Sequence, residues 1–316
     1  MTRRQRCTRR NRAACGIVGL GLGLGLGCGR AHFSELHDAG ATAHDTSLDG
    51  PQSAEGCDPA TPFGAPVEVQ GVNSTAYDST FVPTPDELTA YFYSTRTGDA
   101  DIYRATRPDL ASAWTVARVD ELASPAIEQE PSLSPDGTLL TFSTNRAPNL
   151  GNLDIWYATY DGATFTIVGP LSQFNTTATD YHSVFQDASD QFWFSSNVAG
   201  TFSIYHASHV GTSFGPATIE SELDVAGTNS GAAAPSSDGL TIYFRSDRNA
   251  AVGAYDIYVA HRASTSVGFG PATSVTEVNS ASLDTPNWTS ADGCRLYLSS
   301  SRDDTSNVYV ATKPRM

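Results

Sequence analysis

Lysine is nearly absent from this chain, since Lys313 is the only one among its 316 residues. Basic side chains number 19 against 34 acidic ones, which gives a formal net charge of -15. Nucleic acids and anionic lipid headgroups bind to clustered lysine and arginine. The composition therefore argues against both as partners, and it leaves chemistry that depends on a catalytic lysine with a single candidate.

Several motifs of common enzymes are also missing. The sequence has no His-Glu-x-x-His and no glycine-rich phosphate loop. These absences exclude the usual forms of zinc protease and nucleoside triphosphatase. A long helical pattern is absent too, so we expect an all-β protein. We also expect no cofactor and no bound metal.

The first 28 residues have the three parts of a signal peptide. A basic segment comes first, then an apolar run of alternating glycine and leucine, and then the small residue Gly27 before Cys28. The run is too short and too rich in glycine to span a bilayer comfortably as a helix. Removing residues 1–27 takes away six arginines and no acid, which leaves 13 basic residues against 34 acidic ones, a net charge near -21.

The end of this segment, Leu24-Gly25-Leu26-Gly27-Cys28, resembles a bacterial lipobox. The resemblance implies cleavage before Cys28 and lipid attachment to it, although Gly25 stands where leucine is usual. The alternative is an ordinary signal peptide with an incidental cysteine. We expect an exported protein of the periplasm, the outer membrane or the cell surface, attached to a membrane only through a lipid anchor at Cys28. Residues 29–61 have the composition of a flexible linker.

From residue 62 to residue 316 the sequence repeats one pattern five times. The clearest element is an acidic or polar residue, a β-branched residue and an aromatic, and its central residues lie 53, 49, 53 and 51 positions apart. The five copies are Asp101-Ile102-Tyr103, Asp154-Ile155-Trp156, Ser203-Ile204-Tyr205, Asp256-Ile257-Tyr258 and Asn307-Val308-Tyr309.

Each copy has the same series of short strands around that element. An alternating strand such as Leu140-Thr141-Phe142-Ser143 precedes it, and a hairpin turn such as Asp136-Gly137 precedes that strand. An aromatic residue such as Phe165 opens a further strand after it. Four short antiparallel strands per copy form one blade of a β-propeller. The sequence therefore predicts an all-β, five-bladed β-propeller of four-stranded blades.

The two ends of the array predict how the ring closes. The fifth copy stops at Met316 without its aromatic-led fourth strand, and an unattached copy of that strand, residues 63–69, precedes the first blade. We therefore expect this N-terminal strand to pair within the last blade, which removes the exposed edges of an open array. Cys57 and Cys294 would lie on the same ring face, where either a disulfide or two free thiols would fit the sequence.

The motifs also carry a resemblance. Segments such as Pro131-Ser132-Leu133-Ser134-Pro135-Asp136-Gly137, followed by Phe142-Ser143-Thr144-Asn145-Arg146 and Asp154-Ile155-Trp156, resemble the TolB-type, WD-repeat-like propeller repeat. The resemblance covers about residues 63–313 and implies the fold. The repeat family mixes periplasmic protein-binding propellers, peptidase-associated domains and bacterial surface proteins, so it implies no single function. TolB itself has six blades and a separate α/β domain, so no role in a Tol–Pal assembly is implied.

Acidic residues recur at one position, just before the innermost strand of every blade except the fourth, which has Ser230 there. They are Asp78, Glu128, Asp180 and Asp284. A ring of carboxylate oxygens at the channel mouth would suit a hard cation. A pair of inner-strand carboxylates would also suit glycoside hydrolysis, which five-bladed glycosidases carry out with such pairs.

A structural role accounts for the same residues. An arginine follows the second strand in every copy except the third, which has Asn197; these are Arg96, Arg146, Arg248 and Arg302. Because the third copy lacks the arginine and the fourth lacks the acid, we expect the arginine of one blade to pair with the acid of the next. The acid of the Asp-Ile-Tyr element is a competing partner. Loss of one partner of a buried pair costs about 3–5 kcal/mol, which favours losing both.

The repetition favours binding over catalysis. Equivalent residues recur around the ring, whereas a catalytic acid and base need surroundings that push their pKa values apart. We expect a monomeric, non-catalytic platform for a protein, peptide or glycan; the alternative is a carbohydrate-active enzyme. The third copy departs most from the pattern, which marks either a specialised sector or, more simply, sequence drift. The departures are Tyr181, His182, Trp193, Asn197, His206 and His209.

Overall fold

The computed structural model describes residues 56–58, 60–187, 189–248 and 252–315. The predicted signal peptide, the lipidation site at Cys28 and all but the end of the predicted linker lie outside these residues. Within the described part of the chain, no helix is long and apolar enough to cross a membrane.

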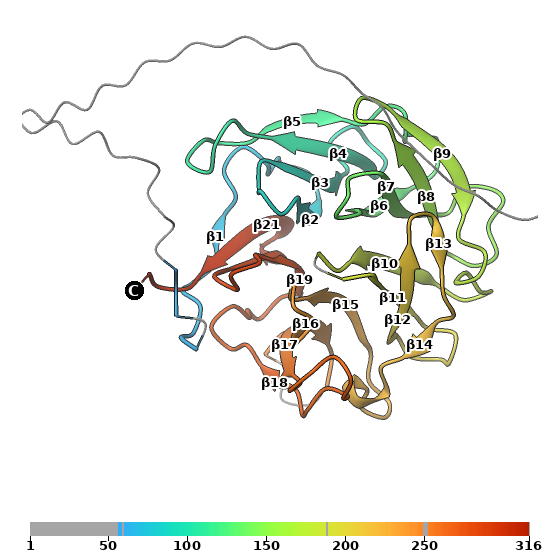
Figure 1. Ribbon diagram of the computed structural model, residues 1–316. Helices are drawn as coiled ribbons and strands as arrows, with labels where there is room; N and C mark the ends of the chain where they lie inside the picture. Colours follow the sequence, from blue (N-terminus) through green and yellow to red (C-terminus); the bar gives the residue numbers. More distant parts are fainter. Residues whose placement is uncertain (1–55, 59, 188, 249–251, 316) are drawn as a thin grey trace, which may run out of the picture. The chain divides into compact units, whose positions relative to one another are not determined.

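Five antiparallel sheets stand around a common axis, one for each sequence repeat (Figure 1). The first contains β2 (Asp78–Pro83), β3 (Thr89–Ser94), β4 (Asp101–Thr106) and β5 (Thr115–Arg118). The second contains β6 (Glu128–Leu133), β7 (Leu139–Thr144), β8 (Asp154–Tyr160) and β9 (Phe165–Pro170). In the third, β10 (Asp180–Phe185), β11 (Gln191–Ser196) and β12 (Ser203–Val210) precede an outer edge divided between β13 (Ser213–Phe214) and β14 (Thr218–Ile219). A short 3-10 helix, Ser221–Leu223, follows.

The last two sheets complete the set. The fourth contains β15 (Ser230–Pro235), β16 (Thr241–Ser246), β17 (Asp256–His261) and β18 (Thr273–Ser274). The fifth contains β19 (Asp284–Thr289), β20 (Arg295–Asp303), β21 (Thr305–Thr312) and the N-terminal β1 (Val67–Glu68).

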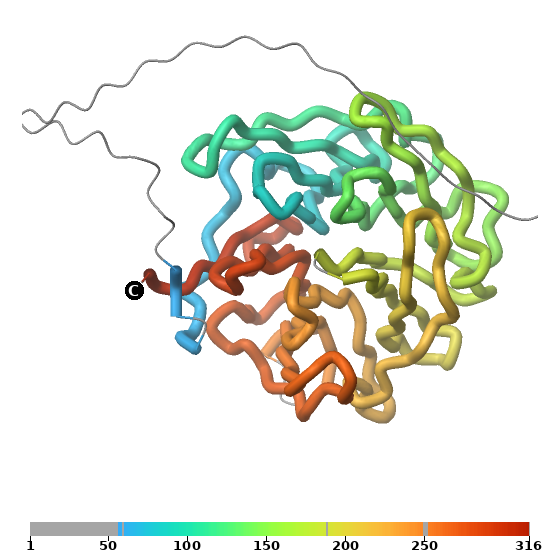
Figure 2. Tube along the Cα trace, viewed as in Figure 1, coloured from blue at the N-terminus to red at the C-terminus, as the bar shows by residue number. Residues whose placement is uncertain are grey.

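The innermost strands form a closed ring. Each of β2, β6, β10, β15 and β19 contacts the innermost strand of the blade on either side, so the first blade lies beside the fifth. The chain trace in Figure 2 passes around this ring once, from blue to red. The predicted five-bladed propeller is therefore confirmed.

Apolar side chains are buried between the blades. Each of the five buried clusters draws its residues from two adjacent blades. One of them joins Phe81 and Trp114 of the first blade to Trp288 and Tyr297 of the fifth. A single repeat cannot bury its apolar faces alone, so stacked repeats stabilise one another. The core therefore depends on the contact that closes the ring.

The N-terminal strand closes the ring as predicted. β1 pairs antiparallel with β21. Backbone hydrogen bonds from the Gly64 amide to the Thr312 carbonyl (2.9 Å) and from the Val69 amide to the Val308 carbonyl (3.0 Å) extend the pairing on both sides. The fifth blade therefore has four strands, although one of them comes from the other end of the chain.

A repeated side-chain contact shows the same closure. In the first blade the Arg107 guanidinium lies 4.3 Å from the centre of the Trp114 ring, which leads the outer strand. In the fifth blade the Lys313 ammonium, near the C-terminus, lies 4.8 Å from the ring of Phe63, at the start of the propeller. Cations are attracted to aromatic faces at such distances. The cation–aromatic contact that lies within one continuous segment in the first blade is therefore made in the fifth blade by two segments far apart in the sequence.

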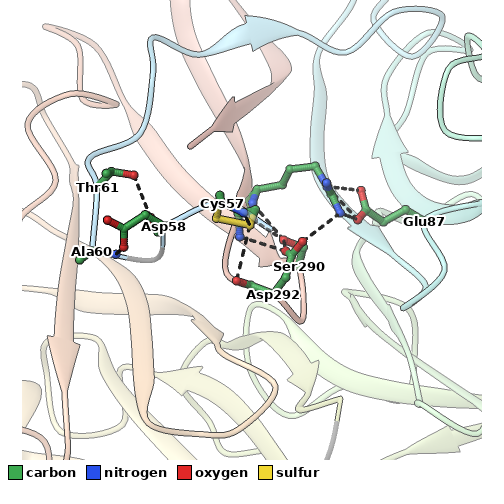
Figure 3. The surroundings of a disulfide bond; sticks show 9 residues. Cys57, Asp58, Ala60, Thr61, Glu87, Ser290 and Asp292 are labelled. Carbon is green, nitrogen blue, oxygen red and sulfur yellow. Dashed lines mark hydrogen bonds and ion pairs between the residues drawn. A yellow bond between two sulfur atoms is a disulfide. The ribbon is translucent and has the colours of Figure 1, made fainter. Parts of the chain in front are cut away.

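A disulfide bond lies beside this closing strand (Figure 3). Cys57 is bonded to Cys294. Of the two possibilities that the sequence left open, a disulfide or two free thiols, the structure has the disulfide. An isolated backbone bridge between Cys57 and Arg315 lies next to it. The bond joins the N-terminal segment to the turn that precedes β20, and it connects positions 237 residues apart.

We expect removal of the disulfide to lower the free energy of unfolding by about 2–4 kcal/mol. The cross-link spans 237 residues, so its loss frees most of the propeller in the unfolded state. The double variant Cys57→Ser, Cys294→Ser should have a lower urea midpoint with a similar slope. Dithiothreitol should lower the midpoint of the parent protein to the same value and leave the variant unchanged. Equal midpoints for all samples would contradict a stabilising role.

Candidate functional site

The four ring carboxylates begin the innermost strands. Asp78, Glu128, Asp180 and Asp284 are the first residues of β2, β6, β10 and β19, and all four are fully buried. Ser230 holds the same position at the start of β15. The predicted equivalence of these positions is therefore correct, but the side chains are covered instead of open to solvent at a channel mouth.

Three of these carboxylates pair with an arginine of their own blade. The distances are 2.6 Å for Arg96 Nη2 to Asp78, 2.7 Å for Arg146 Nη2 to Glu128 and 2.9 Å for Arg302 Nη2 to Asp284. The predicted pairing between blades is wrong, and so is the competing pairing with the Asp-Ile-Tyr acid. The reason is local. Asp78 lies opposite Ser94 in the hairpin of β2 and β3, so an arginine two residues beyond Ser94 reaches back across its own hairpin.

Further contacts hold each of these arginines in place. Arg96 Nη2 also donates to the Val72 carbonyl at 2.7 Å, and its Nε donates to Ser94 Oγ at 2.9 Å. Its guanidinium lies 4.9 Å from the centre of the Tyr103 ring. Arg302 makes the matching contacts in the fifth blade. The carboxylate charge is therefore neutralised within the blade, and these pairs stabilise the fold.

The third and fourth blades each lack one partner and compensate separately. In the fourth, Arg248 donates to Ser230 Oγ at 3.1 Å. In the third, Asp180 lies opposite Ser196, so the register places Val198 at the arginine position, and the predicted equivalence of Asn197 is wrong by one residue. Asp180 accepts hydrogen bonds from Thr176 N at 2.5 Å and Thr176 Oγ1 at 2.9 Å. Burial raises the pKa of Asp180. Asp180 is thus the ring carboxylate that has no arginine among the described residues, and paired loss between blades does not explain the two substitutions.

The cation site considered for these carboxylates would need ligands that gather around one point. In the part of the chain that the structure describes, no three His, Cys, Asp or Glu side chains gather in a way that could hold a metal ion. A cation at the first, second or fifth blade would also have to displace a bonded arginine.

Along the axis, one contact between blades recurs three times. The third residue of an innermost strand lies at a register shift with positive φ, and its amide donates to a serine hydroxyl of the preceding blade. The donors and acceptors are Thr80 to Ser299 (3.0 Å), His182 to Ser143 (3.2 Å) and Ala232 to Ser195 (3.0 Å). Positive φ is uncommon outside glycine, so these bonds support a strained position.

At the other two junctions the serine is replaced and the axis becomes asymmetric. Tyr93 takes its place in the first blade, and the Glu130 carboxylate of the second blade contacts His182 Nδ1 in a buried pair. Arg245 takes its place in the fourth blade and donates to Tyr181 Oη at 2.5 Å. Tyr181 and His182, two of the departures of the third copy, therefore belong to a buried polar network between blades.

At the opposite end of the innermost strands, a turn repeats in four blades. A Ser or Thr hydroxyl donates to the Asp two residues later: Thr84 to Asp86, Ser134 to Asp136, Ser236 to Asp238 and Ser290 to Asp292. In the third blade Gln186 replaces that hydroxyl residue, and Asp187 follows it where the first two blades have proline. The Asp187 carboxylate instead accepts a hydrogen bond from Trp288 Nε1 of the fifth blade at 3.1 Å.

A cavity of about 320 Å³ opens at this end of the ring. Its walls come from the ends of β2, β6 and β10 and from the turns that follow them, and they are largely apolar, with Val82, Leu133 and Phe185 among them. Asp86 and Asp187 also line it. We call it the Asp187 cavity.

A second cavity of about 330 Å³ adjoins the first and shares Pro135 and Asp187 with it. Asp136, Asp190 and His209 line this second cavity. His209 is 8% exposed, and neither of its ring nitrogens has a hydrogen-bond partner among the described residues. Burial lowers the pKa of His209, so the imidazole is neutral at neutral pH.

Asp187 is the unusual acid of this end of the ring. Burial raises its pKa to about 6, although the hydrogen bond from Trp288 acts in the opposite direction. A perturbed acid that lines a cavity is typical of a functional site. Sequence reasoning did not include Asp187 among the candidate residues. The signal that could have found it is the loss of the Asp-Gly turn in the third copy.

We expect Asp187→Asn to stabilise the protein near pH 7 by up to about 3 kcal/mol. The reason is that the pKa of Asp187 is about 6 in the folded protein against 3.8 in the unfolded chain, and a tenfold change in proton affinity corresponds to about 1.36 kcal/mol. The folded-state pKa lies above the unfolded value of 3.8, so the folded form binds the proton more tightly. Stability is therefore lost as pH rises from 3.8 through about 6. An Asn side chain keeps an oxygen for the Trp288 N–H.

Urea titrations of the parent and the Asn variant at several pH values would measure this effect. The gain should be near zero at pH 4 and reach its full size at pH 7. A gain of equal size at both pH values would contradict the raised pKa.

No protein-family model and no curated protein sequence matches this chain. Solved structures do match it. TolB from Acinetobacter baumannii is 17% identical, with a TM-score of 0.48, over 82% of this chain; the chain spans only 63% of that TolB. An endo-arabinase from Bacteroides thetaiotaomicron is 15% identical, with a TM-score of 0.52, over 79% of this chain and 98% of the enzyme. The likeness to the endo-arabinase supports the five-bladed fold and nothing finer.

Proposed function

We propose that this chain is an exported, lipid-anchored propeller that binds a protein or peptide at the Asp187 cavity and performs no catalysis. The observation that carries the proposal is an apolar cavity with two carboxylates, Asp86 and Asp187, at the ring end where the third blade departs from the repeat. Ligand sites are typically concave, mostly apolar and supplied with a few placed polar groups. The signal-peptide pattern and the lipobox resemblance at Cys28 support export and anchoring.

The ring carboxylates argue against a glycosidase. Such enzymes need two carboxyl groups free to act on either side of the scissile bond. Asp78, Glu128 and Asp284 are buried and bonded to arginine. Asp180 alone lacks an arginine among the described residues, and one acid cannot supply both roles.

A peptide fits the Asp187 cavity better than a glycan does. Sugar rings commonly stack on exposed aromatic faces, but Phe185 and Trp288 are only 3% and 4% exposed. The walls instead combine aliphatic side chains with three prolines, Pro83, Pro85 and Pro135. Such a surface is suited to apolar side chains of a peptide.

A peptide array probed with the full chain would test the proposal. We expect it to select peptides whose affinity, measured by calorimetry, falls by about tenfold, or 1.4 kcal/mol, in Leu133→Ala. Val168→Ala is the matched control, because Val168 is a 52% exposed aliphatic residue of β9 that does not line the cavity. Selected peptides that bind both variants as tightly as the parent would contradict a site at this cavity.

The enzymatic alternative predicts a different result. If the chain is a carbohydrate-active enzyme, it should release sugars from arabinan or a related polysaccharide, and Asp180→Asn should abolish the release. Hydrolysis that depends on Asp180 would overturn the proposal. We expect no release above the level of the variant.

A further inference from the structure

We infer that the Asp187 cavity receives the positively charged side chain of an arginine or lysine in the bound peptide. This inference rests on the proposed function and adds the chemical class of the ligand. It follows from the charges that line the two adjoining cavities, from carboxylate oxygens that are left over, and from an unpartnered histidine.

Carboxylates are the ionised groups of this surface. The described residues that line the two cavities include Asp86, Asp136, Asp187 and Asp190 and no arginine or lysine. The chain as a whole carries 34 acidic residues against 19 basic ones. A concave surface lined by charges of one sign concentrates ligands of the other sign. The surface is therefore complementary to a cation.

Each of three carboxylates keeps one oxygen available. The turn hydrogen bonds to Asp86 and to Asp136 all end on Oδ1. The bond from Trp288 to Asp187 ends on Oδ2. The second oxygen of each accepts no hydrogen bond that the described residues donate. A guanidinium group has five donors in a planar fork, which suits several carboxylate oxygens at once.

His209 is the second, independent sign of a missing ligand. The side chain is more than nine-tenths buried, lines the same cavity as Asp136 and Asp190, and has no hydrogen-bond partner among the described residues on either nitrogen. A buried polar group without a partner costs about 1–3 kcal/mol. Neutral imidazole has one nitrogen that accepts a hydrogen bond, so it can accept one from a cationic donor without repelling it.

The apolar walls suit the rest of such a side chain. Lysine and arginine bury their methylene stems along apolar surface while the charged head meets polar groups. In the Asp187 cavity, Val82, Leu133 and Phe185 would contact the stem, and Asp187 would meet the head. Pairing with a cation would also relieve the cost of ionising Asp187 in this partly buried position.

Four model peptides would test the inference: Ac-Ala-Ala-Xaa-Ala-Ala-NH2, with Arg, Lys, citrulline or Glu at Xaa. Citrulline has the shape of arginine without its charge. Binding to the full chain is followed by the indole N–H resonance of Trp288, assigned with Trp288→Phe. We expect the Arg and Lys peptides to shift it and the citrulline and Glu peptides to bind at least about tenfold more weakly, a difference of 1.4 kcal/mol.

Two acid-to-amide variants identify the responsible group. Asp187→Asn should weaken binding of the Arg peptide by about tenfold. Asp238→Asn removes an aspartate that has the same turn hydrogen bond in the fourth blade but lines neither cavity, so binding should not change. Urea titrations of both variants confirm that they are folded.

The outcomes separate this inference from the proposed function. Equal binding of the Arg and citrulline peptides, or an Asp187→Asn variant that binds normally, would overturn the inference. If array-selected peptides without basic residues bind at the cavity while the Arg peptide does not, the peptide-binding function stands and the charge preference is wrong. If no peptide of any charge binds, both fail.

Discussion

Deletion of residues 63–69 should turn a soluble propeller into an aggregating one. The deletion removes β1 and leaves the outer edge of β21 unpaired. Unpaired strand edges present free N–H and C=O groups that pair with other chains. We expect oligomers and precipitate by size-exclusion chromatography, where the parent should elute as one species.

The deletion also removes side chains from the buried clusters on both sides of the last blade. Phe63 and Val69 are each 6% exposed and belong to two different buried clusters. Burial of each such side chain contributes about 1.5–3 kcal/mol. Loss of both, together with the contact between Lys313 and Phe63, should lower the melting temperature even where the variant stays soluble.

A permuted variant is the matched control. In the first blade six residues separate Arg107 from Trp114. Three added residues after Met316, followed by residues 63–69, give the same spacing between Lys313 and Phe63. Both variants are made with Cys57→Ser and Cys294→Ser so that the disulfide does not differ between them. The permuted chain should regain solubility. A deletion variant as soluble and as heat-stable as its cysteine-free parent would contradict closure by this strand.

Glu87→Ala should lower the free energy of unfolding by about 3 kcal/mol, the lower end of what breaking a buried ion pair costs. The Glu87 side chain is 4% exposed; it lies 2.5 Å from Arg295 Nη2 and accepts a hydrogen bond from Tyr297 Oη at 2.8 Å. Both partners belong to β20 of the fifth blade. Glu87, labelled in Figure 3, belongs to the turn between β2 and β3 of the first blade. Truncation leaves the Arg295 charge without its main partner at the junction that closes the ring.

The backbone at Glu87 provides a second variant. Its φ is +53°, and glycine holds the equivalent position in the second, fourth and fifth blades at φ of +71°, +69° and +68°. A side chain in this region costs about 1–2 kcal/mol. Glu87→Gly should therefore lose less stability than Glu87→Ala, since it removes the ion pair but relieves the strain.

Urea titrations would measure both Glu87 variants against Glu121→Ala. Glu121 is an exposed acid of the same blade, and its loss should change stability by less than about 0.5 kcal/mol. If Glu87→Ala is as stable as Glu121→Ala, the ion pair with Arg295 does not hold the ring closed. If the Gly variant is the less stable of the two, the backbone is not strained.

The sequence by itself determined the architecture. The Asp-Ile-Tyr elements, the alternating strands and the Asp-Gly turns act over a few neighbouring residues, so each blade can be recognised from its own segment. Counting strands at the two ends was enough to place residues 63–69 in the fifth blade, because a ring leaves no strand unpaired. Local patterns and their repetition sufficed for this part.

Tertiary structure decided which side chains meet. Arg96 pairs with Asp78 because the hairpin register brings them together, and the recurrence of both residues in other blades could not distinguish a partner in the same blade from one in the next. Contacts across the ring have even less local signature: Trp288 reaches Asp187 over a separation of 101 residues, and Arg295 reaches Glu87 over 208. These contacts form only because the ring closes and because single residues differ from the repeat pattern. The periodicity of the sequence describes only what the repeats share, so it could not predict them.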